Sequence, residues 1–187
     1  DSPFDSLKYA VFQGVSIITT TGYTTADYLK WSSFCQIVLL IMMFFGGMIG
    51  STTGGIKQVR VYLMIKQIFR EIYQLIHPRA VLSLKLDDKF LTKETLGSIW
   101  GFVFLVVFLF ALSCIAMTAT GLDLITSIST VASAMNNVGP ALGEAGPASN
   151  YSSIPFLGKW ILIFCMLAGR LEYYTVLVLL TPAFWKR

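Results

Sequence analysis

The sequence predicts an all-α membrane protein made of a repeated unit: a spanning helix, a short re-entrant helix ending in a polar segment, and a second spanning helix. Hydrophobic residues make up 55% of the 187 residues and charged residues 13%, with a mean hydropathy of +0.69, whereas a soluble domain carries about 25% charged residues. Three runs, 31–50, 95–120 and 160–185, carry almost no charge, and each has the roughly 20 residues that cross a bilayer. Disordered and disulfide-rich classes are excluded, because 14% of the residues are aromatic and only three are cysteines.

The first expected element is a short helix over residues 5–18, followed by the polar segment 19–23, TTTGY. At 1.5 Å per residue the helix reaches only about 20 Å, so we expect it to enter the membrane and return to the same face. Gly22 can take a positive φ, which lets successive carbonyl oxygens point the same way. Such a column can replace the hydration shell of a potassium-sized cation, and the negative end of the helix dipole favours a cation there. An ordinary outer turn is the alternative. The candidate ligand residues are Thr20, Thr21, Gly22 and Tyr23.

The next expected element is a helix over residues 31–76 that is broken by the glycine-rich loop 46–55. Glycine costs about 1 kcal/mol per residue relative to alanine inside a helix, so an unbroken helix is not expected. A phosphate-binding loop is excluded, because the pattern GxxxxGK[ST] is not met. A broken helix near an ion path can serve as a gate or as a transporter binding site, and the loop alone does not separate the two. The residues concerned are Gly46, Gly47, Gly50, Ser51, Thr52, Thr53, Gly54 and Gly55.

Charge sets the expected orientation. Ten of the 14 lysines and arginines lie between the first two apolar runs or at the chain end, while the segments 1–30 and 121–159 hold only Lys8, Lys30 and Lys159 beside five acids. The positive-inside rule then places the linker 77–94 and the C-terminus in the cytoplasm of a multi-pass protein. The basic, amphipathic stretch 56–76 is either the continuation of the broken helix or a helix on the lipid surface.

The second half repeats the first. A spanning helix over 95–120 precedes a short helix over 123–135, a polar segment 136–140 and a helix over 157–184. The pattern aligns Gly22 with Gly139 in the polar segments, and Gly47 with Gly169 in the spanning helices. The first copy lacks the helix that corresponds to 95–120, so residues 1–76 are one incomplete repeat and 95–187 a complete one. The candidate ligands of the second segment are Asn137, Val138 and Gly139.

Four motifs in order, SIITTTGYTTADY, FFGGMIGSTTGGIK, AMNNVGP and GRLEYYTVLVLLTPAFWKR, resemble the TrkH-type membrane subunit of the Trk/Ktr potassium uptake family. The resemblance covers essentially the whole chain. It implies a potassium-channel-like pore of four units, each with a pore helix and filter, of which this chain supplies the third and fourth. It also implies that the loop 46–55 gates the pore beneath the filter. Only the glycine is shared by the two filters, which departs from the near-identical filters of potassium channels. The sequence therefore supports the passage of cations more strongly than strict selectivity for potassium.

The resemblance further implies potassium as substrate, no cofactor in this chain, and the cell inner membrane as location. The expected partners are the remaining two pore repeats, a second copy in a homodimer, a cytoplasmic nucleotide-binding regulatory subunit and membrane lipid, with no nucleic acid. The chain is not expected to be an enzyme, since a serine protease built on Ser51 or Ser133 would have no base: the single histidine, His77, lies outside the membrane. The alternatives are a non-conducting structural or assembly fragment and a cation symporter driven by protons or sodium.

Arg170 is the charge expected nearest the membrane midplane. It lies about 15 Å along a helix from Trp160 and about 22 Å from Trp185, and a charge at that depth normally faces a cavity or a partner. Glu172 is two positions away and points from a different face, so a local pair is disfavoured. One interpretation is a structural ion pair with one of the repeats that this chain does not contain. The other is that Arg170 faces the cavity below the filter, repels cations and donates hydrogen bonds to the loop 46–55, so that it holds the gate shut.

Overall fold

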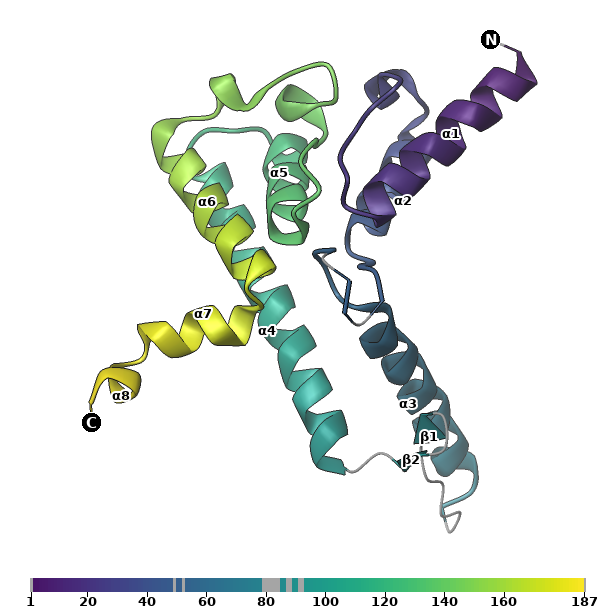
Figure 1. The fold of residues 1–187 in the computed structure, drawn as a ribbon, viewed down its shortest axis with the longest axis vertical. Helices are drawn as coiled ribbons and strands as arrows, with labels where there is room; N and C mark the ends of the chain where they lie inside the picture. The colour runs from purple at the N-terminus through teal and green to yellow at the C-terminus, as the bar shows by residue number, and fades with distance from the viewer. Residues whose placement is uncertain are drawn as a thin grey trace.

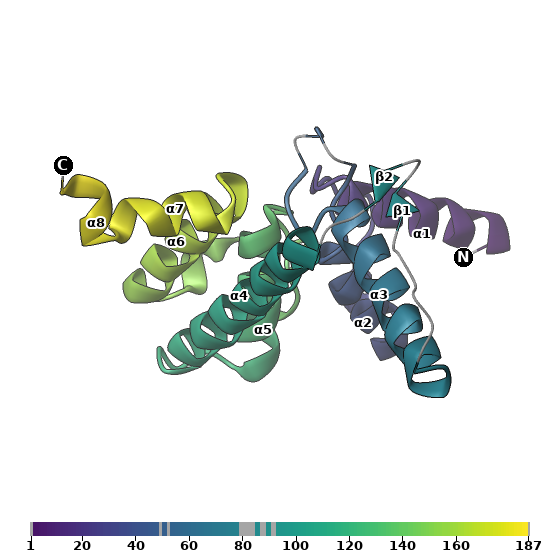
Figure 2. The same ribbon diagram turned by 90° about the horizontal axis from the view of Figure 1, so that it is seen from below.

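The computed structural model describes residues 2–48, 50–51, 53–78, 85–86, 89–90 and 93–186. Thr52 and much of the expected linker 77–94 therefore lie outside the described residues. The all-α class is confirmed: the regular elements of the described chain are helices, apart from a two-stranded antiparallel ribbon of β1 (Lys85–Leu86) and β2 (Lys89–Phe90). Figure 1 shows two halves, α1–α3 and α4–α8, and Figure 2 places the two termini at opposite ends of the molecule.

The first half begins with helix α1 (Pro3–Ile18), because the Ser2 hydroxyl caps it by accepting from the Asp5 N–H and Pro3 suits the first turn. Its buried face carries Gln13, Ser16 and Ile17. A short turn η1 (Tyr28–Lys30) leads to α2 (Ser33–Met43). The apolar run 31–50 was expected to begin a spanning helix, but α2 has only 11 residues, about 16 Å of rise. Helix α2 is therefore too short to cross the membrane without the loop and the helix that come after it.

The break in the 31–76 helix falls between α2 and α3 (Gln58–Ile76). The loop between them closes at a narrow neck, where Gly46 donates its N–H to the Ile56 carbonyl (2.9 Å) and Ile56 donates to the Phe44 carbonyl (3.1 Å). These two bonds satisfy backbone groups that an interrupted helix leaves unpaired. Residue Lys57, directly after the neck, precedes the first turn of α3.

The second half is built around α5 (Leu124–Asn136), of whose thirteen residues ten are buried. Asp123 caps it by accepting from the backbone N–H groups of Ile125 and Thr126, and hydrogen bonds from Thr126 lower the pKa of that carboxyl. Helices α4 (Lys93–Thr118) and α6 (Phe156–Arg170) pack on α5 and form the larger core with it. Short turns η2 (Gly143–Ala145) and η3 (Tyr151–Ser153) lie between α5 and α6.

The expected helix over 157–184 needs correction, because it is not continuous. It consists of α6, α7 (Tyr173–Leu180) and α8 (Pro182–Trp185), with a bend of 115° between α6 and α7. The chain turns at Glu172, whose φ is +63°, and α7 stops before Pro182, since the residue before a proline avoids the helical region. Among the described residues, α4 is long and apolar enough to cross a membrane, and α6 with α7 passes the same test as a bent pair.

Candidate functional site

The two polar segments fold back from their short helices in the same way. Thr20 and Asn137 take left-handed backbone angles, with φ +53° and +55°, and Gly22 and Gly139 also have positive φ. In the first segment Thr21 donates its N–H to the carbonyl of Ser16, and in the second Val138 donates to that of Ser133, both at 2.9 Å. The repeat expected from sequence is thus present in the backbone, residue by residue.

The hydrogen bonds divide the carbonyls of these segments into two groups. The Ser16 hydroxyl donates to the Tyr23 carbonyl and the Tyr151 phenol to the Gly139 carbonyl, both at 2.6 Å. The remaining candidate carbonyls accept no hydrogen bond within the part of the chain that the structure describes. That second group consists of Thr20, Thr21, Gly22, Asn137 and Val138.

The fold brings the two segments together. An ideal Cβ built on Gly22 would lie 2.2 Å from the Val138 carbonyl oxygen and 3.1 Å from Cδ of Pro140. The first segment therefore contacts the second at Gly22, on the side of its Cα where another residue would carry a side chain. Val138 itself is 3% exposed, whereas the Tyr23 side chain points outward with 73% exposed. Tyr23 thus belongs to the segment by its backbone, while its ring takes no part in the contact between the two segments.

The glycine-rich loop lies against the end of α5 (Figure 1). A Cβ on Gly54 would lie 2.0 Å from the Asn136 carbonyl oxygen, and one on Gly55 would lie 3.1 Å from Oδ1 of the same residue. Asn136 is the last residue of α5 and the first of the polar segment 136–140. The loop therefore sits next to the inner end of the second segment, and glycine is what permits so close an approach.

The loop's hydroxyls hold its shape. The Gly47 N–H donates to Oγ1 of Thr53 at 2.7 Å, and the hydroxyls of Ser51 and Thr53 are also 2.7 Å apart. Gly47 and Gly169, aligned in the sequence, differ in what they contact. Gly47 approaches its own loop, whereas a Cβ on Gly169 would lie 2.0 Å from the Met135 carbonyl of α5. The two glycines therefore allow different close contacts.

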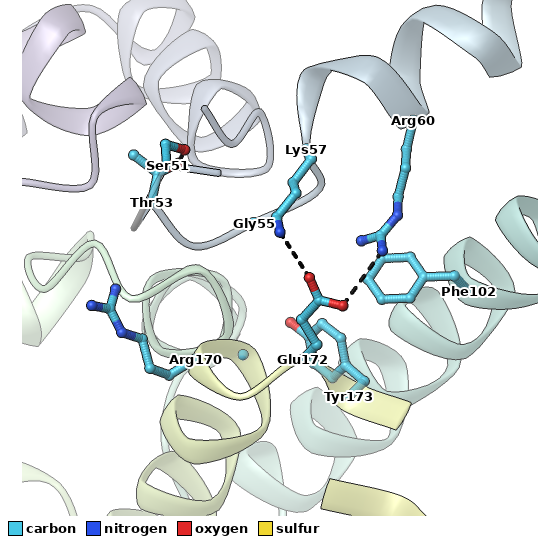
Figure 3. Close-up of a pocket in the computed structure, with 10 residues that line it drawn as sticks. Ser51, Thr53, Gly55, Lys57, Arg60, Phe102, Arg170, Glu172 and Tyr173 are labelled. Carbon is cyan, nitrogen blue, oxygen red and sulfur yellow. Dashed lines mark hydrogen bonds and ion pairs between the residues drawn. The ribbon is translucent and has the colours of Figure 1, made fainter. Parts of the chain in front are cut away.

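A cavity of about 220 Å³ opens beside the loop, between the start of α3 and the end of α6. Figure 3 shows the side chains that line it. The hydroxyls come from Ser51 and Thr53, and the charged groups are three cations and one acid: Lys57, Arg60, Arg170 and Glu172. A cavity with this lining carries positive charge next to the loop, and it can slow a cation that passes through it.

Arg170 ends α6 and lines this cavity. Figure 3 shows its side chain extending to the opposite side of the cavity from the carboxylate of Glu172. Glu172 instead receives a hydrogen bond from Lys57 Nζ at 2.8 Å and faces Arg60 Nη2 at 3.5 Å. Sequence reasoning missed this bridge, because its members lie in different repeats.

Three further contributors were also missed. Ser16 and Ser133 each stand six residues before a segment glycine, and that shared spacing was a visible signal. Ser133 is 1% exposed, and its hydroxyl accepts the N–H of Gly139 at 3.0 Å. Tyr151 gave no sequence signal, since it reaches Gly139 through the tertiary fold.

Comparison with known proteins finds one matching family and several similar sequences. Residues 5–187 match the model of the family TrkH, described as cation transport protein. The Trk system potassium uptake protein TrkH of Halomonas elongata is 45% identical over 181 residues, which are 97% of this chain and 37% of that protein. TrkH of Escherichia coli is 43% identical over the same shares.

A solved structure agrees as well. The crystal structure of the potassium transporter TrkH from Vibrio parahaemolyticus superimposes with a TM-score of 0.91 at 42% identity, covering 99% of this chain and 39% of that one. The chain thus spans less than two fifths of the length of these relatives.

Proposed function

Because this chain belongs to the TrkH family of cation transport proteins, we propose that it forms part of the wall of a pore through which potassium ions enter the cell across its membrane. The relatives named above are potassium uptake proteins, and in our proposal the chain supplies one complete and one incomplete repeat of such a pore. The observation that supports the proposal most directly is the contact between two repeat-related segments, in which the carbonyls of Thr20, Thr21, Gly22, Asn137 and Val138 accept no hydrogen bond within the described chain.

The chemistry of these segments suits a cation. Carbonyl oxygens can replace the water around potassium, and in our proposal those of Thr20, Thr21, Gly22, Asn137 and Val138 do so. Tyr23 and Gly139 contribute shape, because their carbonyls already accept hydrogen bonds from Ser16 and Tyr151. The C-terminal ends of α1 and α5 lead into the segments, and the negative ends of their dipoles favour positive charge there.

The proposal includes the partners that complete the pore. The exposed apolar face of α1, with Phe4, Leu7, Val11 and Val15, is where we expect the remaining repeats to pack. The outer face of α4, with Phe104 and Ile115 exposed, suits contact with lipid. A homodimer, and a nucleotide-binding regulatory subunit on the basic side of α3, complete the proposed assembly.

A hybrid transporter tests the function. In it, residues 5–187 replace the matching segment of Escherichia coli TrkH, and growth on low potassium and rubidium uptake are measured in cells without other potassium uptake. We expect uptake from the hybrid and none from the chain alone. A properly inserted hybrid that does not transport would favour the alternative of a structural or assembly fragment. Uptake that stops when the proton or sodium gradient is collapsed would favour a symporter over a passive pore.

We also propose that the loop 46–55 and Arg170 form the gate. Support comes from the loop's position at the end of α5 and from the guanidinium in the cavity beside it. Of the loop residues named from sequence, Thr52 lies outside the described residues and stays in the proposal by its place in the chain alone. A guanidinium near the ion path raises the energy of a passing cation.

Arg170→Ala is expected to raise rubidium flux through the hybrid about tenfold, which corresponds to a free-energy barrier lower by about 1.4 kcal/mol. The physical reason is the loss of a repelling charge and of the group that we propose holds the loop. Flux is measured in proteoliposomes without a regulatory partner, and Arg170→Lys, which keeps the charge, should show a smaller rise. Unchanged or lower flux in a normally inserted Arg170→Ala protein would count against this gate.

Ser133→Ala is expected to weaken the discrimination between rubidium and sodium about tenfold. The N–H of Gly139 would lose its acceptor in a partly buried hydrogen bond, which contributes about 0.5–1.5 kcal/mol, so the second segment would relax. Competitive uptake of the two ions measures the effect. Ser127→Ala is the matched control: Ser127 is also buried on α5, but its hydroxyl has no hydrogen-bond partner within the described chain. Equal behaviour of the two variants would refute the role given to Ser133.

A further inference from the structure

Glu172 joins the two repeats at the level of the proposed gate (Figure 3). Its two carboxylate oxygens take different partners, Oε1 with Lys57 Nζ at 2.8 Å and Oε2 with Arg60 Nη2 at 3.5 Å. Both cations are about three-quarters buried, with 25% and 26% of their side chains exposed. One acid from the end of the second repeat thus holds two cations from the first.

The start of α3 needs this acid. The N-terminus of a helix carries partial positive charge, and acidic residues there are stabilising while cations are not. Helix α3 has no acidic residue in its first turn and no side-chain cap, and its cap position is Lys57. Arg60 adds a second cation in the same turn. Glu172 therefore supplies, from another part of the chain, the negative charge that the local sequence lacks.

The same contact reaches the loop. Lys57 directly follows Ile56, whose N–H and carbonyl make the two hydrogen bonds of the loop's neck. A shift of Lys57 would move the neck, and with it Gly54, which rests against Asn136. Arg60 is fixed from its other side too, because its guanidinium lies 3.9 Å from the centre of the Phe102 ring on α4.

On the other side, Glu172 is the residue at which α6 and α7 bend by 115°. Its φ of +63° is unfavourable for a residue with a side chain, at a cost of about 1–3 kcal/mol. A straighter path would relieve that strain but would carry the carboxylate away from Lys57 and Arg60. The neighbouring Tyr173 donates its phenol to the Met135 carbonyl at 3.0 Å, which ties the bend to α5 as well.

From these contacts we propose that Glu172 is a positioning residue of the gate: its bridge to Lys57 and Arg60 holds the neck of the loop 46–55 and the bend between α6 and α7 in the closed arrangement. This inference rests on the proposed function, because it needs the loop to be the gate. It assigns to Glu172 no contact with the ion. Its effect should therefore fall on how often the pore opens and leave the affinity of the filter unchanged.

The test compares variants of the hybrid transporter in proteoliposomes without a regulatory partner. Glu172→Gln is expected to raise the maximal rubidium flux about fivefold, a size suited to two partly exposed ion pairs, and to leave the half-saturating rubidium concentration unchanged. Lys57→Gln removes the main pair from the other side and should act in the same direction. The exchanged pair Lys57→Glu with Glu172→Lys restores attraction and should return the flux toward that of the parent.

Glu71→Gln is the control, since Glu71 lies on α3 but is bonded to Gln67 of the same helix. Unchanged maximal flux in inserted Glu172→Gln would overturn the proposal, as would a rise that the exchanged pair does not reverse. If Glu172→Gln does not reach the membrane, Lys57→Gln decides by the same criteria. A rise in rubidium flux in Arg170→Ala without one in Glu172→Gln would contradict this inference alone. No rise in either variant would contradict the proposed gate as well.

Discussion

Gly22→Ala in the hybrid transporter is expected to reduce potassium uptake at least a hundredfold. Two costs act together. The φ of +75° at this position is unfavourable for alanine by about 1–2 kcal/mol. In addition, the new Cβ would lie 2.2 Å from the Val138 carbonyl oxygen, well inside van der Waals contact. Because Val138 belongs to the other polar segment, one methyl group would displace the proposed ligands of both repeats.

Two other glycines separate these costs. Gly139→Ala should reduce uptake less than Gly22→Ala, since φ is +109° but no atom lies within 4 Å of the new Cβ. Gly121 also has a positive φ of +93° and open space around its Cβ position, but it lies outside the two polar segments. Gly121→Ala should therefore leave uptake near that of the parent. Rubidium uptake is normalised to the amount of protein in the membrane. Near-normal uptake in an inserted Gly22→Ala protein would contradict the proposed filter.

Gly54→Ala is expected to raise ion flux about tenfold in the absence of a regulatory partner. The new Cβ would lie 2.0 Å from the Asn136 carbonyl oxygen, so either the loop or the end of α5 must move. Helix α5 is buried over ten of its residues and is held at Met135 by Tyr173. The loop has fewer restraints, and we therefore expect it to lift away from the segment and open the path.

Gly50→Ala is the matched control within the loop. Its φ of +88° makes alanine unfavourable there too, but its Cβ would meet no atom within 4 Å. It should therefore strain the loop without pushing it from α5, and flux should change far less than in Gly54→Ala. A fall in flux for inserted Gly54→Ala, or equal flux in both variants, would show that the contact with Asn136 does not close the pore.

The two polar segments show how far local sequence reasoning reaches. The segments 19–23 and 136–140 could be located because each combines a helix too short to cross the membrane with a glycine where the chain must turn. Their similar backbone form could be expected from the alignment of Gly22 with Gly139. That Gly22 faces Val138, and that Tyr151 occupies the carbonyl of Gly139, could not be expected, since both contacts depend on how the repeats pack.

The last helix shows where such reasoning failed. Residues 157–184 are apolar over most of their length, and apolarity alone predicted one continuous helix. Nothing in the local sequence before Pro182 marks a break, because Leu171 and Glu172 are ordinary helix formers. The bend is accompanied by the bridge from Glu172 to Lys57 and Arg60, which lie more than a hundred residues earlier in the chain. A pattern read within a short window does not contain that information.

The sequence alone thus determined the membrane class, the repeat, the two glycine-centred segments and the break at 46–55. These features depend on apolar length, charge distribution and the backbone freedom of glycine, all of which act over a few neighbouring residues. Only the tertiary structure decided that the segments touch, that Gly54 rests on Asn136, and that Glu172 bends the last helix while bridging to the first repeat. Those contacts join residues far apart in the chain, and their energies depend on distances between atoms that only the packed repeats define.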